Sequence, residues 1–373
     1  MNAPRPMPSP ACPLCNRADR EVHTLAHARL RHVDFHDLGQ GGAIAACPAC
    51  GAWQNLAVDL IAAAERLYAD ALYFHSAQTH HRVTVTDFPE PVTRPLLQAE
   101  LLQRHLPAPP RRILDVGCFD GLLLVELERR FPGLEAHGCD LNPRYREVFP
   151  RCDGFHLWLE PDALHRLDGP FDLITLSHSI MYFADLAELL ARLRALLAPD
   201  GRLFVQTADL AVQPVGLVLG DQAWYFTRAN LAATLQAAGF APRLLHVPWF
   251  PREACVLARP EVGGESLPVD SLDDILARLT ALATAIAATA PGEPLWVLGT
   301  TSPAAFAHGV LGDRCAGFVD EHPSLRGGNF RDLPVLHPQD LSPRTTVVLP
   351  YGASAAPLAQ RLAARYPGRF LTA

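Results

Sequence analysis

Short apolar runs alternate with amphipathic segments along most of this sequence. Residues 113–116, 134–139 and 171–176 are apolar runs bounded by polar or glycine positions, which is typical of buried parallel strands. Residues 122–131 and 185–197 have the spacing of amphipathic helices. Because strands that alternate with helices form parallel sheets covered on both faces, the pattern predicts an α/β fold.

The same alternation divides the chain into three predicted domains. Residues 1–88 contain two cysteine pairs and an amphipathic run that predicts a helical lid, and residues 89–260 contain the strands and helices described above. Residues 261–373 begin with a linker rich in Gly and Pro and predict a smaller Rossmann-like unit. In that unit Gly299 and Asp320 could hold a nucleotide-like group, although such a unit more often has a structural or substrate-docking role.

A glycine-bearing turn follows the first strand of the central domain. Gly117 and Gly121 flank this turn, and the next helix presents N–H groups at its start that attract polar or anionic ligand atoms. Asp140 ends the following strand about 20 residues later, where a carboxylate can accept both hydroxyls of a ribose. The turn therefore predicts a nucleoside-binding site in a Rossmann-like domain.

The turn resembles motif I of the class I S-adenosylmethionine-dependent methyltransferases, whose usual form is Asp-x-Gly-x-Gly-x-Gly. Here Asp115, Gly117 and Gly121 match the motif, and Phe119 stands where the middle glycine is expected. The resemblance implies S-adenosylmethionine as the cofactor, with this turn around its methionine end and Asp140 on its ribose. The later order of a Phe-Asp-x-Ile strand, a helix and Pro-Asp-Gly also resembles this fold.

Polar residues end the strand predicted at 171–176. Ligands bind outside the carboxyl ends of such strands, so we expect His178, Ser179 and Tyr182 to face the cofactor's methyl group. Ser177, at the end of the strand, is a further expected cofactor-binding residue. The predicted chemistry is displacement at the sulfonium methyl, with the protein orienting the acceptor and supplying a base. His178 is the first candidate base because an imidazole titrates near neutral pH, and Tyr73 and Tyr225 are the next candidates.

Two Cys-x-x-Cys pairs, Cys12 with Cys15 and Cys47 with Cys50, lie near the N-terminus. Each pair places two thiolates on a tight turn, and two such turns complete the tetrahedral shell of a zinc ion. A shell of four thiolates leaves no open position, so the predicted Zn²⁺ is structural. The four histidines between the pairs are expected to be surface residues of a loop-rich ribbon: His23, His27, His32 and His36.

The order of cysteine pairs, methyltransferase core and C-terminal Rossmann-like unit resembles the nucleotide-sugar C-methyltransferases of deoxysugar biosynthesis. In that family a tyrosine from a segment like 73–76, a histidine at the position of His178, and a Tyr-His-Glu-His segment remove a proton next to a sugar ketone. Here residues 219–222 stand at the last segment, and only Asp221 could take the place of its glutamate. The two histidines of that segment have no counterpart in residues 219–222. O- or N-methylation of a carbohydrate or another small natural product needs a weaker base than carbon methylation and is consistent with their absence.

Composition narrows the choice of partner. The formal net charge of −7 argues against a protein that binds a phosphate backbone, and no apolar run is long enough for a membrane span. We expect a cytoplasmic enzyme that methylates a small molecule, for example a sugar or nucleotide sugar, at carbon or oxygen. An RNA methyltransferase with a zinc ribbon and a non-catalytic module that binds S-adenosylmethionine remain alternatives. The acceptor and the oligomeric state do not follow from the sequence.

Overall fold

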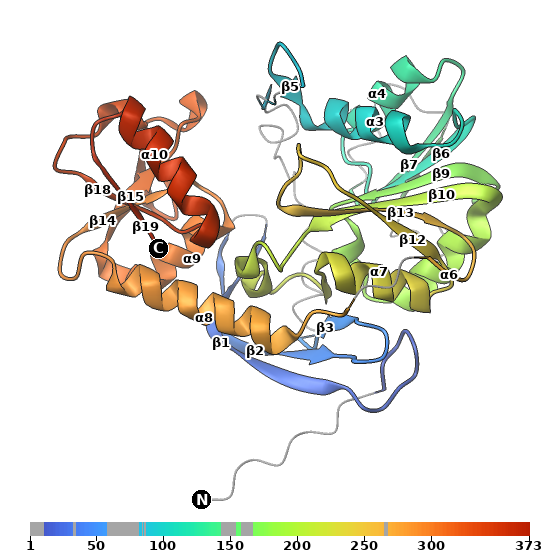
Figure 1. Ribbon diagram of the computed structural model, residues 1–373, viewed down its shortest axis with the longest axis horizontal. Coiled ribbons are helices and arrows are strands. Elements are labelled where there is room, and N and C mark those ends of the chain that lie inside the picture. Colours follow the sequence, from blue (N-terminus) through green and yellow to red (C-terminus); the bar gives the residue numbers. More distant parts are fainter. Residues whose placement is uncertain are drawn as a thin grey trace, which may run out of the picture. The chain divides into compact units, whose positions relative to one another are not determined.

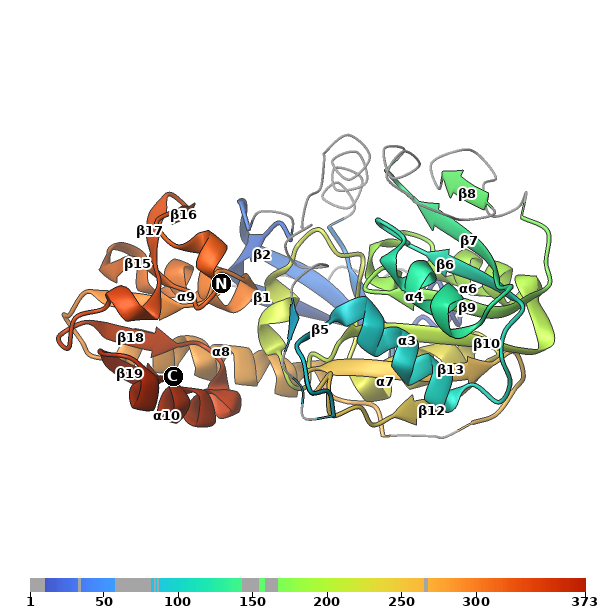
Figure 2. The ribbon, with the colours of Figure 1, turned by 90° about the horizontal axis from the view of Figure 1, so that it is seen from above.

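The computed structural model shows two compact units (Figures 1 and 2). The first unit comprises Met1–His23, Ile44–Val212 and Gln222–Asp270, and the second comprises Thr24–Ala43, Gln213–Asp221 and Ser271–Ala373. The structure describes residues 11–32, 35–57, 82–83, 85, 87–142, 154–157, 167–264 and 268–373. The predicted lid helix and Tyr73 lie outside these residues, and the division into three domains stays a prediction.

A seven-stranded sheet forms the centre of the first unit, in the order β12-β13-β10-β9-β6-β7-β8. Its strands are β6 (Arg112–Val116), β7 (Glu135–Asp140), β8 (Gly154–Leu157), β9 (Phe171–Ser177), β10 (Leu197–Ala208), β12 (Ala241–Leu245) and β13 (Glu253–Arg259). Pairing is parallel from β10 to β8, whereas β13 runs antiparallel to both β10 and β12. The predicted α/β fold is therefore confirmed for this unit.

Helices cover both faces of this sheet (Figure 1). Helices α3 (Arg94–His105) and α4 (Leu122–Arg130) pack on one face, and α6 (Leu186–Leu196) and α7 (Arg228–Ala237) pack on the other. Successive side chains of each strand point to opposite faces of the sheet. Ile113 and Leu173 therefore belong to the core under α3 and α4, and Leu114 and Ile174 belong to the core on the opposite face. The short pair β4 (Arg82–Val83) and β5 (Val92–Thr93) precedes α3.

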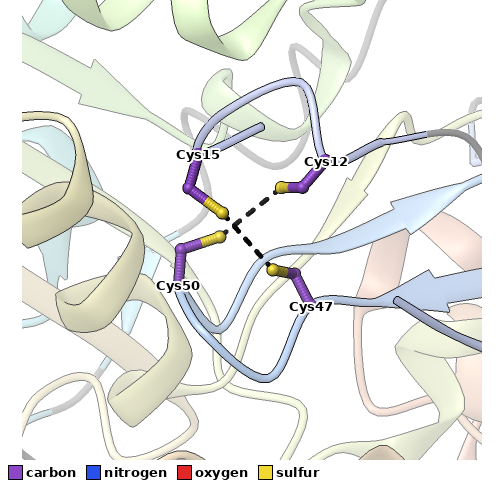
Figure 3. Close-up of side chains that lie close together, drawn as sticks. All are labelled: Cys12, Cys15, Cys47 and Cys50. Carbon is purple, nitrogen blue, oxygen red and sulfur yellow. Dashed lines mark hydrogen bonds between the residues drawn. The ribbon is translucent and has the colours of Figure 1, made fainter. Parts of the chain in front are cut away.

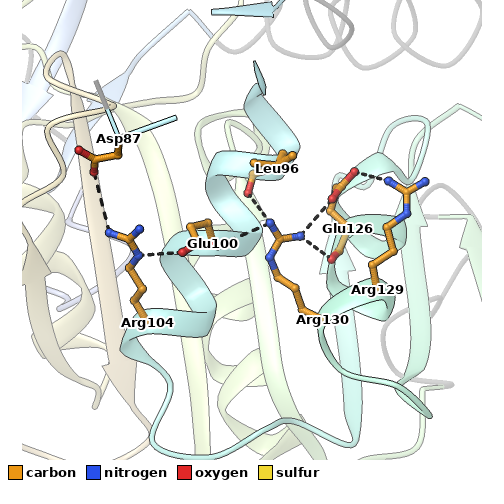
Figure 4. A network of polar contacts seen from close by, with 7 residues as sticks. All are labelled: Asp87, Leu96, Glu100, Arg104, Glu126, Arg129 and Arg130. Carbon is orange, nitrogen blue, oxygen red and sulfur yellow. Dashed lines mark hydrogen bonds and ion pairs between the residues drawn. The ribbon is translucent and has the colours of Figure 1, made fainter. Parts of the chain in front are cut away.

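A polar network joins α3 to α4 along their solvent side (Figure 4). Arg130 Nη1 donates 3.0 Å hydrogen bonds to Glu126 one turn earlier, and Arg130 Nη2 lies 3.7 Å from Glu100 on α3. Glu100 also accepts a 2.9 Å hydrogen bond from Arg104. The network fixes how the helix that begins at the glycine turn lies against its neighbour.

The N-terminal cysteine segment contains more regular structure than expected. The strands are β1 (Glu21–Leu30), β2 (Asp37–Ala46) and β3 (Trp53–Asn55), so the segment between the cysteine pairs is not a loop-rich ribbon. In the first unit β3 pairs with Ile44–Ala46 on one side and with β11 (Trp224–Tyr225) on the other. His27 is half-buried in the second unit, where its ring lies 5.3 Å from that of Phe306, and this burial lowers its pKa.

The second unit contains a six-stranded sheet in the order β16-β17-β15-β14-β18-β19, with all but β16 parallel. Its strands are β14 (Leu295–Leu298), β15 (Cys315–Val319), β16 (Asn329–Phe330), β17 (Leu333–Leu336), β18 (Thr346–Leu349) and β19 (Arg369–Thr372). Its helices are α8 (Leu272–Ala288), α9 (Ser302–Leu311) and α10 (Ala355–Arg365). No helix among the described residues is long and apolar enough to span a bilayer.

Candidate active site

The candidate site lies where the strand order of the first sheet reverses. Strand β6 is central, the chain continues to β7 and β8 on one side, and it then returns to β9 on the other side of β6. Ligands of such sheets bind in the crevice outside the carboxyl ends of the strands at this switch point. Residues 117–121 follow β6 and residues 177–179 follow the parallel strand β9. Both predicted segments therefore meet at the same edge of the sheet.

Three alternate residues of the glycine turn have left-handed backbone conformations. The φ angles are +81° at Gly117, +49° at Phe119 and +72° at Gly121. The turn thus keeps its course with Phe119 in a conformation that usually requires glycine. Gly117 has a second constraint, because a Cβ atom there would overlap the Cβ atom of Ser179.

Asp140 holds this turn through its side chain. Its Oδ2 atom accepts a 2.9 Å hydrogen bond from the backbone N–H of Phe119, and its Oδ1 atom accepts one of 3.0 Å from Asn142. Burial raises the pKa of Asp140 to about 6, although these hydrogen bonds act in the opposite direction. Each carboxylate oxygen keeps acceptor capacity for a hydroxyl, so the geometry is compatible with the predicted ribose contact.

Asp115 connects β6 to β9 below the turn. Its Oδ1 atom accepts a 2.6 Å hydrogen bond from the hydroxyl of Thr175, its partner in the parallel register. Asp115 is 2% exposed, and burial raises its pKa to about 7, with a further contribution from the charge on Asp140. This acid is therefore part of the sheet interior directly beneath the predicted cofactor turn.

The start of α4 offers backbone donors to a ligand. Gly121 is the N-cap residue and has no side chain to cap the helix, whereas the N–H of Leu122 donates a 3.3 Å hydrogen bond to the carboxylate of Asp120. The first N–H groups of an α-helix have no partner within the helix and attract polar or anionic atoms. The glycine turn, Asp140 and these donors suit the methionine and ribose parts of S-adenosylmethionine, so the residues present fit the cofactor that the sequence predicted.

His178 follows β9 in a strained backbone conformation. Its φ angle is +54°, and its N–H donates a 2.8 Å hydrogen bond to the carbonyl of Gln206 on β10. Its Nε2 atom lies 3.1 Å from Oε2 of Glu253 and 2.5 Å from Nη2 of Arg94. The backbone of His178 is thus held by β10, and its imidazole lies at the carboxyl edge of the sheet against groups from α3 and β13.

A hydrogen-bonded chain leads from Ser177 to this histidine. Gln98 of α3 donates to the hydroxyl of Ser177 and, over 2.7 Å, to the side-chain oxygen of Gln206. Gln206 in turn donates a 2.6 Å hydrogen bond to Oε2 of Glu253, which also pairs with Arg94. Burial would raise the pKa of Glu253, but His178 and Arg94 hold it well below its usual range. Glu253 is therefore ionised.

Sequence reasoning missed Glu253, Arg94, Gln98 and Gln206. One signal for Glu253 was present, because it is the acid directly before the apolar run 254–258. Since β13 is antiparallel to β10, with Glu253 opposite Ala208, its first residue lies at the edge where the parallel strands end. An acid at the amino end of such a strand reaches the same site as His178.

The other predicted site residues have different surroundings. Tyr225 is 1% exposed and lies in β11 opposite Trp53, within the first unit. Asp221 belongs to the second unit, where its Oδ2 atom accepts a 2.8 Å hydrogen bond from the N–H of His32. Tyr73 lies outside the described residues. Of the three candidate bases, His178 is the one that follows β9, the strand paired with β6, which leads into the glycine turn.

The predicted metal ligands come together in the first unit (Figure 3). The sulfur atoms of Cys12, Cys15, Cys47 and Cys50 all lie within 4.8 Å of one another, with 3.6 Å from Cys12 to Cys50 and 3.5 Å from Cys15 to Cys47. Zn–S bonds of about 2.3 Å in a tetrahedron separate sulfurs by about 3.8 Å. The donor set and its spacing therefore fit a zinc ion.

Residues 93–254 match a family model described as a methyltransferase domain. The demethylmenaquinone methyltransferase of Thermus thermophilus is 38% identical over 102 residues, which are 26% of this chain and 46% of that protein. The trans-aconitate 2-methyltransferase of Methylobacterium radiotolerans is 35% identical over 130 residues, 35% of this chain and 49% of that protein. The chain thus spans about half the length of the curated relatives it matches.

A solved structure of an O-methyltransferase family protein from Burkholderia thailandensis is 19% identical. It covers 45% of this chain and 56% of its own, with a TM-score of 0.37. The family match includes β6, α4, β7, β9 and the first residues of β13, and therefore both the glycine turn and Glu253. Residues 93–254 form a class I methyltransferase domain.

Proposed function

We propose that this protein is an S-adenosylmethionine-dependent methyltransferase that acts on a small molecule. The observation that carries the proposal is the placement of the glycine turn, Asp140 and His178 at the switch point of a methyltransferase domain. When bound, S-adenosylmethionine supplies an electrophilic methyl group on a sulfonium. The chain's own residues hold the cofactor, orient the acceptor and take up its proton.

Asp115, Gly117, Phe119, Gly121, Asp140 and Ser177 are the proposed cofactor residues. Asp140 fixes Phe119, and the turn has left-handed residues at 117, 119 and 121. This backbone would approach the methionine part of the cofactor, and the Asp140 carboxylate would accept the ribose hydroxyls. Ser177 ends β9 beside this turn and is oriented by Gln98. These contacts would position the methyl group next to the side chain of His178.

His178 is the proposed base, with Tyr73 as the second candidate. The imidazole is 37% exposed, so an acceptor can reach it, whereas Tyr225 is almost fully buried. We propose a sugar or nucleotide sugar as the acceptor, methylated at carbon or oxygen. The order of cysteine pairs, methyltransferase domain and C-terminal parallel sheet supports this acceptor class.

We also propose that the four cysteines hold a structural zinc ion. The hydrogen bond between their thiols lowers the pKa of Cys12 to about 4 and raises that of Cys50. The turn of Cys50 packs on α7, where its carbonyl accepts a hydrogen bond from Thr234. Zinc would therefore stabilise the surface that supports one face of the methyltransferase sheet.

Calorimetric titration with S-adenosylhomocysteine tests the cofactor proposal. Wild-type protein should bind the ligand in the micromolar range, and Asp140→Ala should lose binding because the turn loses its anchor and the ribose its acceptor. Asp200→Asn is the matched control, since Asp200 is exposed near the start of β10, away from the carboxyl edge. Absence of binding by the folded wild-type protein would contradict the proposal.

Transfer of labelled methyl groups then tests the acceptor. Nucleotide-sugar ketones, nucleotide sugars with free hydroxyls, and RNA should be compared with the same enzyme preparation. We expect label in a nucleotide sugar and loss of transfer in His178→Gln. Label in RNA alone, or cofactor binding with no transfer to any acceptor, would contradict the proposed substrate class.

A further inference from the structure

We propose that Glu253 is a positioning residue that holds the Nε2–H group of His178 and leaves Nδ1 to accept the substrate proton. The inference rests on the proposed methyl transfer and assigns a role to an acid that the sequence analysis did not identify. Glu253 acts through His178, with which its carboxylate oxygen makes a 3.1 Å contact. It is not a group that touches the acceptor.

The two ring nitrogens of His178 have different surroundings. Nε2 faces Glu253 and Arg94, within hydrogen-bonding distance of both. No described residue makes a hydrogen bond with Nδ1, and the side chain is 37% exposed. Because a neutral imidazole carries one proton, a hydrogen on Nε2 leaves Nδ1 with the lone pair that a base needs.

The carboxylate of Glu253 is itself fixed from the opposite side. Gln206 donates to its Oε2 atom over 2.6 Å, and the Gln206 amide is oriented because its oxygen accepts a 2.7 Å hydrogen bond from Gln98. Gln98 therefore determines that Gln206 presents N–H groups, not its oxygen, to Glu253. A carboxylate held in this way offers an acceptor of constant position to the imidazole.

Arg94 competes with Glu253 for the same nitrogen. A guanidinium can only donate, so Arg94 can bond to Nε2 only if that atom carries no hydrogen. The alternative for Arg94 is the ion pair with Glu253, which the structure also contains. A buried carboxylate gains more from two donors, one of them the charged guanidinium, than from one, and this favours the arrangement in which Arg94 and Nε2–H both donate to Glu253.

The remaining charged groups near this cluster do not compete for the imidazole. Arg228 of α7 donates to the backbone carbonyl of Glu253 and pairs with Asp209 at 3.5 Å. Cys255 lies two residues along β13, and burial raises the pKa of its thiol to about 12, so it is neutral. The proton balance of the site thus depends on Arg94, Glu253 and His178.

The proposed step conserves atoms and charge. The acceptor's C–H or O–H proton moves to Nδ1 of His178, and the electron pair it leaves forms the bond to the methyl carbon. The carbon–sulfur bond of the sulfonium breaks with its electron pair on sulfur, which gives S-adenosylhomocysteine. His178 becomes an imidazolium beside the Glu253 carboxylate, which stabilises the new charge.

Nitrogen-15 NMR of histidine-labelled protein tests the tautomer without any acceptor. The His178 signals are identified by their loss in His178→Gln, and spectra are recorded at about pH 9, where an ordinary imidazole is neutral. We expect wild-type His178 to carry its proton on Nε2. A proton on Nδ1 would overturn the proposal, because Arg94 would then be the group that fixes the ring.

Two variants separate the roles of the competing groups. Glu253→Gln should reduce the Nε2–H population, and Arg94→Met should leave it unchanged or raise it. The reverse order of effects would also overturn the proposal. Glu261→Gln is the matched control, because Glu261 is an exposed acid paired with Arg259. Each variant should bind S-adenosylhomocysteine as wild type does, so that a failed cofactor site is seen separately from a failed tautomer assignment.

Discussion

The carboxylate of Asp140 accepts a 2.9 Å hydrogen bond from the backbone N–H of Phe119, the residue that replaces a motif glycine. Phe119 has a φ angle of +49°, which costs a non-glycine residue free energy. Asp140 thus holds in place the one turn residue whose side chain opposes the required backbone conformation. This relationship links the predicted ribose acid to the shape of the predicted methionine site.

Replacement of Phe119 should reveal the free energy stored in this turn. Phe119→Ala and Phe119→Gly both remove the half-buried ring, but only glycine adopts the left-handed conformation without strain. We therefore expect Phe119→Gly to be more stable than Phe119→Ala by about 1 kcal/mol. Urea unfolding of both variants measures the difference, and equal stabilities would show that the turn is unstrained at this position.

Stability should depend on pH through Asp115. Its folded pKa is about 7, whereas an unfolded aspartate titrates near its ordinary value of about 3.9. Between these values the folded chain binds a proton that the unfolded chain lacks, so the contribution of Asp115 to stability falls as pH rises from about 4 to about 7.

Asp115→Asn removes this titration and keeps an oxygen that can accept the hydrogen bond from Thr175. We expect the variant to gain stability relative to wild type by about 1–3 kcal/mol more at pH 8 than at pH 5. Urea unfolding at the two pH values provides the comparison. If the variant and the wild type differ in stability by the same amount at pH 5 and pH 8, Asp115 is ionised in the folded protein at both pH values.

Gly117 should tolerate no side chain while Ser179 is present. A Cβ atom at residue 117 overlaps that of Ser179, whose hydroxyl donates a 2.6 Å hydrogen bond to the carbonyl of Val116. Gly117→Ala should weaken S-adenosylhomocysteine binding by about tenfold or more, equivalent to about 1.4 kcal/mol. The double variant Gly117→Ala with Ser179→Gly should recover part of that loss, and Ser179→Gly alone is the control. If the double variant binds no better than Gly117→Ala, the loss of binding comes from the left-handed backbone at residue 117 and not from the overlap with Ser179.

Loss of the proposed zinc should destabilise the first unit. Wild-type protein should contain about one zinc ion per chain, and Cys47→Ser should lower both the zinc content and the unfolding temperature. Cys315→Ser is the control, because Cys315 is a buried thiol of the second unit. Elemental analysis with calorimetric unfolding makes the measurement, and a normal unfolding temperature in metal-free protein would contradict a structural role.

Local spacing was sufficient to predict the glycine turn and the cysteine cluster. Asp115, Gly117 and Gly121 lie within seven residues, and each Cys-x-x-Cys pair is a single turn, so the chain itself brings the members of each set together. The two cysteine turns are 32 residues apart and meet in the folded first unit. The strands that carry the turn follow from apolar runs in the same way.

The cluster around His178 could not be found by such local reasoning. Arg94 and Gln98 come from α3, Gln206 from β10 and Glu253 from β13, and only the sheet order brings them together. Each is an ordinary polar residue in its own segment, where the simplest expectation is exposure to solvent. The strand β19 was also missed, because its four residues at the C-terminus have no distinctive apolar pattern.

The pairing of β3 with β11 also has a consequence for synthesis on the ribosome. The cysteine turns are made first, but Trp53 pairs with Tyr225, and the turn at Gly51 packs against Ala233 of α7. The N-terminal sheet therefore cannot be completed until β11 has left the exit tunnel, and the turn at Gly51 cannot pack on α7 until that helix follows. Force measurements on stalled nascent chains should show a folding step once α7 has emerged, and none of that kind when only β3 has emerged.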